Sequence, residues 1–405
     1  MISYQKISKV LIFLFPISMI SGQMIPEIIL ILGLMISIFK EYKNIKLDKI
    51  SLSFLVLFFF LTLEIIIVYQ NFEFQSIKQI FVFRFILYGL IISVFFSRDL
   101  KFLKNFFYFL IFIFIFLLFD SFYQFINGEN IIGLKNETHY RISSFFGDKY
   151  VLGSYIGRLA PILLSLSIYL FKKDNYFNYI ILNSSLLITI ISGDRISLVF
   201  SASIFILHIF INFKLKYSFL FLFLIFSSFL ISLLTIQSLN ERIIGKTLSE
   251  IKVDNKLIYF TPYHHNYALV SLNMFKKKPY FGHGIKSFRL KCAENEFKKN
   301  ILDEYDSCST HSHNYYLQFL SENGIFNFLI LLFIFFLSSF YCIKNLFKFF
   351  YTKNHLHLSK TYIYFGLLIN LFPFMPSGNF YNGWLLCILT LYIVSINLYE
   401  NENNS

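Results

Sequence analysis

The chain has 405 residues, of which 56% are hydrophobic and only 15% are charged, and its formal net charge is +13. A soluble domain carries roughly 25% charged residues, so this composition excludes a soluble globular protein. The lysines and arginines fall in short clusters between apolar runs, which argues against nucleic-acid binding and predicts short cytoplasmic loops of a membrane protein.

The apolar runs are long enough to cross a bilayer, which takes about 20 residues per helix. Backbone groups cannot stay unpaired in hydrocarbon, so each run is predicted to be helical. We therefore expect an all-α, polytopic membrane protein with about 12 transmembrane helices, forming a single membrane domain over residues 1–405. The expected spans are 10–22, 24–39, 50–69, 80–97, 105–126, 153–171, 176–192, 196–213, 217–237, 314–341, 361–375 and 381–397.

The first two runs are short and share a break at Gly22 and Pro26, so one kinked helix or a re-entrant pair is the alternative there. The positions of the basic clusters predict both termini in the cytoplasm. Two long segments then lie outside, 127–152 and 238–313. The second carries twelve Lys and Arg against eight Asp and Glu. Its charge suggests an anionic ligand or lipid headgroups, with a merely solvated surface as the alternative.

Ionisable residues at the ends of membrane helices are costly and are therefore functional candidates. They gather near the outer ends of the expected spans, at Glu64, Arg84, Asp120, Arg158 and Arg195, and Arg141 lies in the first outer loop. An arginine offers a planar fork of donors to a phosphate. For Arg195, which follows the turn Ser192–Asp194, the alternatives are snorkelling to the interface or pairing with Asp194.

Histidines gather before the tenth expected span. His311, His313 and Asn314 lie at its outer mouth, and His264 with His265 lies earlier in the same loop. A histidine can accept a proton at neutral pH because its ordinary pKa is near 6.5. Four histidines are also a possible metal site, but the chain has no HExxH or paired-cysteine zinc pattern. We expect no metal and no cofactor.

Two cysteines, Cys292 and Cys308, lie in the large outer loop with fifteen residues between them. The space outside the membrane is oxidising, so the pair predicts a disulfide. Closing such a loop is worth on the order of 3 kcal/mol in the chain-entropy model. We expect this bond to position the segment 311–314.

These segments resemble a known family. HSHNYYLQFLSENGIF at 311–326 is similar to the signature of the O-antigen ligase and polymerase superfamily. Four further blocks resemble that family in the expected order: RISSFFGDKYVLGSY at 141–155, SGDR at 192–195, KKKPYFGHGIKSFRLKC at 276–292 and FPFMPSGNFYNGW at 372–384.

The resemblance implies a GT-C-like transferase of the bacterial inner membrane with its active site facing the periplasm. Such an enzyme moves a glycan from undecaprenyl pyrophosphate to a sugar hydroxyl, without a metal and with inversion. In a ligase the acceptor is lipid A-core, and in a polymerase it is another lipid-linked glycan; we favour the ligase. Membrane lipids are further expected partners.

On this resemblance His313 corresponds to the general base, beside His311 and Asn314, and Arg195 corresponds to an arginine that holds the pyrophosphate. Arg141 and Arg158 are further candidates for that contact. The family often has a second arginine about fifteen residues before the proline of the glycine block. This chain has His264 there, so the alternatives for the second phosphate contact are His264, His265, Arg242 and Arg289.

A transporter is the alternative from another functional class. Transporters show charged or glycine-broken helices near the bilayer midplane, often in paired halves. This chain keeps its charges near one face and has no matching halves, which favours the transferase.

Overall fold

The computed structural model describes residues 4–68, 79–135, 141–172, 175–214, 227, 230, 234–237, 240–253 and 256–402. Its long helices are α1 Tyr4–Ser18, α2 Met24–Glu41, α3 Lys49–Val68, α5 Arg84–Arg98, α6 Leu100–Asn127, α7 Leu152–Phe171, α8 Tyr176–Ile191, α9 Arg195–Asn212, α15 Tyr315–Thr352, α16 His355–Asn370 and α17 Gly383–Glu402. Within the described residues, six of them are long and apolar enough to cross a membrane: α3, α6, α7, α9, α15 and α17.

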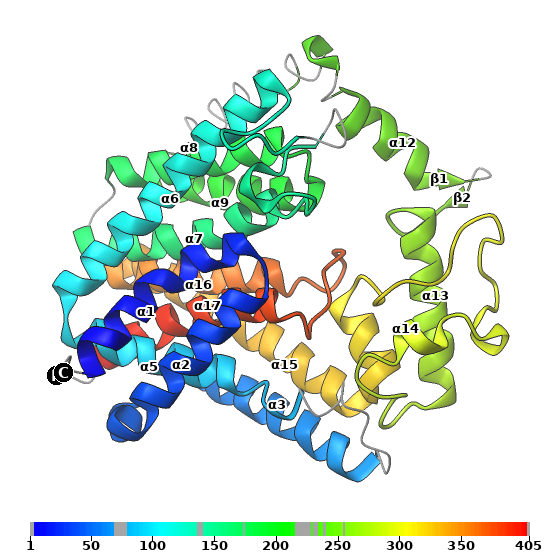
Figure 1. The fold of residues 1–405 in the computed structure, drawn as a ribbon, viewed down its shortest axis with the longest axis horizontal. Helices are drawn as coiled ribbons and strands as arrows, with labels where there is room; N and C mark the ends of the chain where they lie inside the picture. The colour runs from blue at the N-terminus through cyan, green and yellow to red at the C-terminus, as the bar shows by residue number, and fades with distance from the viewer. Residues whose placement is uncertain are drawn as a thin grey trace.

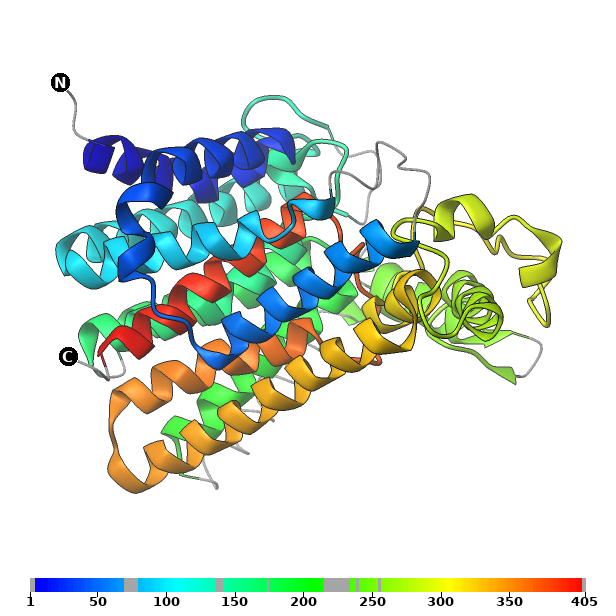
Figure 2. The ribbon, with the colours of Figure 1, turned by 90° about the horizontal axis from the view of Figure 1, so that it is seen from below.

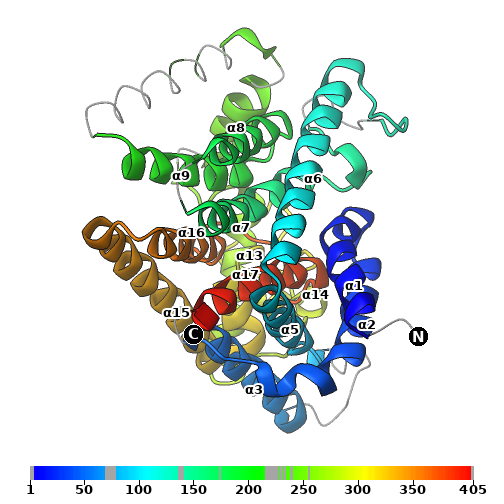
Figure 3. The same cartoon turned by 90° about the vertical axis from the view of Figure 1, so that its left-hand side faces the viewer.

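The prediction of a multi-pass helical membrane protein is confirmed at the level of these six helices. Eleven of the expected spans coincide with a described helix, and the expected span 217–237 lies outside the described residues apart from isolated positions. α1 and α2 are separate helices joined by the 3-10 turn Met19–Ser21 and by Gly22, whose φ is 114°. They pack side by side as a hairpin, so the break at Gly22 is a turn between two helices (Figure 3).

The centre of the bundle is formed by α7 and α17. Of the apolar stretch of each, 83% is buried inside the protein, against 28% for α15. The exposed face of α15 carries Phe333, Phe336 and Phe340, whose spacing places them on one side of the helix. Because lipid tails are apolar, this stripe is suited to face the membrane, and α15 lies at the periphery of the bundle (Figure 3).

The segment expected as the large outer loop folds into short elements beyond one end of the bundle (Figure 1). They are α12 Lys246–Ile251, the strands β1 Lys252–Val253 and β2 Lys256–Leu257, α13 Pro262–Lys277 and α14 Phe288–Lys291. The two strands form an antiparallel hairpin. α13 and α14 share a small core of their own, which includes Tyr267, Val270, Met274, Phe288 and Phe297. The loop therefore has a defined structure and docks on the start of α15.

α15 is broken at Gly324, which has φ 73° and ψ −171°. That backbone conformation is essentially confined to glycine. The break frees backbone groups that the segment 279–284 satisfies. The N–H of Ile325 donates to the carbonyl of Pro279 at 2.8 Å, and the N–H of Gly284 donates to the carbonyl of Glu322 at 2.6 Å. The segment 279–284 thus supplies the hydrogen bonds that the break in α15 removes.

The contact at this break leaves no room for side chains. A Cβ on Gly324 would lie 2.1 Å from the carbonyl oxygen of Tyr280, and a Cβ on Gly282 would lie 2.4 Å from the backbone of Glu322. Glycine is therefore required at both positions. This close packing holds the loop at a defined place relative to the beginning of α15.

Candidate functional site

Asn314 connects three segments at the start of α15. Its side-chain oxygen accepts from the backbone N–H of Tyr316 at 2.9 Å and of Leu317 at 3.1 Å, so Asn314 is the N-cap of the helix. Its amide nitrogen donates to the carbonyl of Pro373 at 2.6 Å and to the hydroxyl of Tyr259 at 3.1 Å. Because both ends of the amide are used inside the protein, Asn314 acts as a positioning residue.

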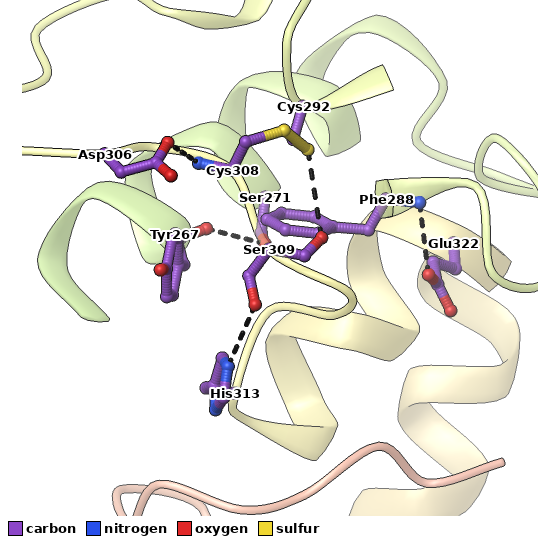
Figure 4. The surroundings of a disulfide bond; sticks show 9 residues. All are labelled: Tyr267, Ser271, Phe288, Cys292, Asp306, Cys308, Ser309, His313 and Glu322. Atoms are coloured by element: carbon purple, nitrogen blue, oxygen red, sulfur yellow. Dashed lines mark hydrogen bonds between the residues drawn. A yellow bond between two sulfur atoms is a disulfide. The ribbon is translucent and has the colours of Figure 1, made fainter. Parts of the chain in front are cut away.

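His313 is held by its backbone and its ring. Its φ is 54°, a left-handed conformation that is uncommon for a residue other than glycine. The backbone N–H of Ser377 donates to its carbonyl at 2.8 Å. The ring Nε2 lies 3.1 Å from the hydroxyl of Ser309, and Figure 4 shows Ser309 between His313 and the disulfide. The backbone contact with Ser377 and the ring contact with Ser309 together fix the orientation of the His313 ring.

Three histidines come together at this point. The ring centroids of His311 and His313 are 4.0 Å apart, and those of His264 and His313 are 5.2 Å apart. Tyr267 of α13 stacks on His313 at 5.4 Å. His264 lies in the first turn of α13. The hydroxyl oxygen of Thr261, the N-cap residue of this helix, lies 2.6 Å from the Nδ1 atom of His264. Residues about fifty positions apart thus share one site.

The surroundings of the three histidines favour their neutral forms. Burial lowers the pKa of His313 below its ordinary value of 6.5. Burial lowers the pKa of His264 to about 4, with the charges of His313 and Arg195 acting in the same direction. Burial and His313 lower the pKa of His311 to about 3, against an opposing effect of the Ser377 backbone. At pH 7 each imidazole is neutral, so His313 can accept a proton.

Arg195 is the first residue of α9 and lies close to this cluster. Its Nη1 donates to the hydroxyl of Thr247 at 2.8 Å, and its charge acts on His264. The carboxylate of Asp194 accepts from the backbone N–H of Ser197 at 3.3 Å, which makes Asp194 the N-cap of α9. The guanidinium of Arg195 thus extends from the capped start of α9 toward the loop 238–313, where it contacts Thr247.

The turn that carries Arg195 packs on the beginning of α7. A Cβ on Gly153 would lie 2.5 Å from the hydroxyl of Ser192, so glycine permits this approach. The blocks 141–155 and 192–195 are therefore in contact, although about forty residues separate them. Their order in the sequence gave no indication of that contact.

Two further candidate arginines lie in α14 and α7. The charge of Arg289 in α14 lowers the pKa of His311, which places its guanidinium near the histidines. Arg158 of α7 is 6% exposed and lies over the ring of Phe200 at 5.1 Å. With Tyr315, the residue after Asn314, Arg158 lines a cavity of about 50 Å³ inside the bundle.

The other candidates have different surroundings. Arg141 donates to the carbonyl of Tyr150 at 3.1 Å and stacks over its ring at 4.6 Å, both within the first outer loop. His265 receives the backbone N–H of Tyr259 on its Nδ1 at 3.4 Å. The side chain of Arg242 lies outside the described residues.

Cys292 and Cys308 form a disulfide with a Cα–Cα distance of 5.1 Å (Figure 4). Cys292 is fully buried in the core of the loop, against Tyr267 and Phe288. Ser309, which lies against His313, directly follows Cys308. The bond therefore fixes the chain five residues before His313. The other two cysteines, Cys342 and Cys387, are free and buried.

A buried polar network lies behind the site, and of its members only Glu64 was a candidate from the sequence. Gln318 donates to the carboxylate of Glu322 at 2.9 Å and to the side chain of Asn379 at 2.9 Å, and the backbone N–H of Phe288 reaches Glu322 at 3.2 Å. Asn323 and Asn327 donate to Glu64 of α3. The recurrence of Gln, Glu and Asn inside an otherwise apolar run was the available signal. The network joins the break in α15 to α3, α14 and the segment 372–384.

No group of three His, Cys, Asp or Glu that could hold a metal ion is found in the part of the chain that the structure describes.

The fold and the site define a class: a multi-pass helical membrane protein with a cluster of histidines and arginines at one end of its bundle. Residues 180–332 match the family model described as O-antigen ligase, with the short name Wzy_C. Over this segment the chain is similar to the O-antigen ligase and polymerase superfamily, and the resemblance inferred from its motifs is confirmed there. The match spans Arg195, His264 and His313. No curated protein matches the chain.

Proposed function

We propose that the chain is a glycosyltransferase of the O-antigen ligase type. It transfers a glycan from undecaprenyl pyrophosphate to a sugar hydroxyl of lipid A-core, at the periplasmic face of the bacterial inner membrane. The observation that carries this proposal is the convergence of Arg195, His264 and His313. They come from the start of α9, the first turn of α13 and the segment before α15, and they act on one another electrostatically or through ring contacts.

In the proposed reaction His313 takes the proton of the acceptor hydroxyl as the oxygen attacks the anomeric carbon of the donor. The bond from that carbon to the phosphate oxygen breaks, and its electron pair leaves with the pyrophosphate. A single in-line displacement inverts the anomeric carbon. A neutral His313 is the form that this step needs, and burial favours that form at pH 7.

The leaving group gains negative charge, so fixed cations stabilise it more than a proton donor does. Arg195 supplies the first such contact in this proposal. Arg289, whose charge acts on His311, supplies a further cation from the loop. Arg158 lines a separate cavity inside the bundle. His264 stands where the family often has a second arginine. As a neutral ring beside Thr261 it contributes a hydrogen bond rather than a charge.

The polymerase activity is the main alternative, because both reactions use the same donor and need the same groups. Deleting the gene and resolving the surface glycolipid on a gel separates them. Loss of all polymer, with full-length lipid-linked glycan accumulating, supports the ligase. A core bearing a single repeat supports the polymerase, and an unaltered glycolipid contradicts both and leaves a transporter as the alternative.

A further inference from the structure

A second cavity lies at the other end of the bundle. It has a volume of about 360 Å³ and opens between the end of α7 and the connection from α15 to α16. Its walls include the aliphatic and aromatic side chains of Ile168, Tyr169 and Leu356. Its polar lining comes from Lys172, Lys353 and His355, with Asn354 beside them, and no acidic side chain lines it among the described residues.

The cavity is far from the histidine cluster. α15 begins at the cluster and, beyond its break at Gly324, continues without interruption to Thr352, a length of about 40 Å at 1.5 Å per residue. That exceeds the roughly 30 Å of bilayer hydrocarbon. Figure 2 shows the connection from α15 to α16 at the end of the bundle opposite α13 and α14. The two sites therefore face opposite sides of the membrane.

Both lysines occupy positions where glycine is usual. Lys172 follows the last turn of α7 with φ 54°, and Lys353 follows the last turn of α15 with φ 55°. Glycine is favoured there because a left-handed residue with a Cβ is strained. The presence of lysine at both ends brings two positive charges, from two different helices, to one cavity.

The third wall is also suited to an anion. α16 begins at His355, and its N-cap is the side chain of Asn354. A helix N-terminus carries partial positive charge and free N–H groups. In addition, the Nδ1 atom of His355 is buried and has no hydrogen-bond partner. Two lysines, the start of α16 and His355 thus line the same space.

This end of the bundle has the features of a membrane interface. Tyr176 and Tyr351 are 67% and 95% exposed, and Lys104 lies 5.6 Å above the ring of Phe171 at the end of α7. Exposed tyrosines with lysines at helix ends are typical of the depth at which lipid headgroups lie. A phosphate bound at this depth is most readily supplied by a phospholipid.

We infer that this cavity is a binding site for the phosphate of an anionic phospholipid headgroup. The two lysines bind the phosphate oxygens, the start of α16 adds N–H donors, and the apolar wall contacts the glycerol and acyl carbons. Such a lipid joins the ends of α7, α15 and α16, so it stabilises the bundle from the side opposite the catalytic cluster. The inference does not depend on the proposed transferase activity.

The test uses the full-length chain, purified in detergent and delipidated. Dioleoyl phosphatidylglycerol, dioleoyl phosphatidylcholine and inorganic phosphate are added separately, and bound lipid is counted by native mass spectrometry together with the melting temperature. The wild-type chain is expected to prefer phosphatidylglycerol. Lys172→Asn with Lys353→Asn is expected to weaken that binding about fivefold for each charge removed, since asparagine tolerates the left-handed backbone while removing the charge.

Two controls make the result specific. Lys172→Arg with Lys353→Arg keeps both charges and is expected to retain the preference. Lys40→Asn with Lys46→Asn removes two exposed lysines at the connection of α2 to α3, outside the cavity, and is also expected to retain it. Equal binding of the two lipids by the wild type, or loss of the preference in the second control, overturns the site. Stabilisation by inorganic phosphate equal to that by phosphatidylglycerol overturns the assignment to a lipid.

Discussion

The helical bundle and the loop 238–313 are stabilised in different ways. The bundle is held by large apolar area: α7 and α17 are almost entirely buried, and their neighbours differ mainly in how much surface they leave for lipid. The loop has a core of only a few side chains. It depends instead on one disulfide, a fitted glycine contact and side-chain caps such as that of Asn314.

This difference has a consequence for function. Apolar contacts tolerate substitution of one aliphatic residue for another, because the burial is spread over many side chains. The contacts of the loop are single interactions, so each affects the position of His313 directly. Substitutions in the loop are therefore expected to reduce transfer while leaving membrane insertion intact.

The largest effect is expected from His313→Ala. Removing the proposed general base lowers transfer by about 10²–10⁴-fold, measured with the purified chain, a lipid-linked glycan and an acceptor. The matched control is His357→Ala, since His357 bonds to Asn345 near the opposite end of the bundle. Wild-type transfer by the His313 variant removes this residue from the mechanism.

Arg195→Ala is expected to lower transfer by about 10²–10³-fold, because one fixed donor to the leaving pyrophosphate is lost. Arg195→Lys keeps the charge but not the planar fork, so it is expected to restore only part of the rate. The measurement is the same assay, with the amount of membrane-inserted protein determined in parallel. Equal rates for the alanine variant and the wild type contradict the proposed contact.

Gly324→Ala tests the fitted contact between loop and bundle. Alanine adds a Cβ that would lie 2.1 Å from the Tyr280 carbonyl, so the cost exceeds the about 1–3 kcal/mol of the strained backbone conformation alone. We expect a lower melting temperature and a loss of transfer as His313 moves. Gly128→Ala is the control, since Gly128 also has positive φ (79°) but has open space around it. An equal effect of both variants rules out the close contact as the cause.

Removing the disulfide by Cys292→Ser with Cys308→Ser is expected to destabilise the loop by about 3 kcal/mol. Transfer decreases because Ser309 and His313 are held less firmly, but helix insertion does not change. The bond itself is checked by labelling with a thiol-reactive polymer before and after reduction. Labelling of both cysteines in the native, non-reduced protein contradicts the pairing.

The smallest effect is the pH dependence. The pKa values of His264, His311 and His313 are lowered in the folded protein, so the cluster stays neutral below pH 6.5. The acidic limb of the transfer rate is therefore expected below pH 6.5. As the pH falls from 6.5 towards about 4, the unfolded chain binds more protons than the folded one, so stability decreases. If the transfer rate falls to half of its maximum at pH 6.5 or above on the acidic side, the lowered pKa values of the histidines are contradicted.

Much of the bundle could be predicted from the sequence because hydrophobicity alone places a helix in a membrane. The expected run 314–341 was too short for α15, which extends to Thr352, because the interfacial lysines and aromatics after 341 continue the helix beyond hydrocarbon. The break at Gly324 was not predicted, because an isolated glycine in a helical run does not by itself indicate what packs against it. Likewise Thr261 and Ser309 were not candidates, since their role depends on His264 and His313 lying beside them.

By itself the sequence indicated the membrane class, the approximate positions of eleven helices and, through ordered motifs, the family that residues 180–332 resemble. These properties depend on composition, local periodicity and residue order. Only the tertiary structure brought Arg195, His264 and His313 to one place and left Arg141 against Tyr150. The physical reason is that residues far apart in the chain meet only where backbones approach closely, as at Gly153 and Gly324, and such contacts depend on how helices and loop pack together.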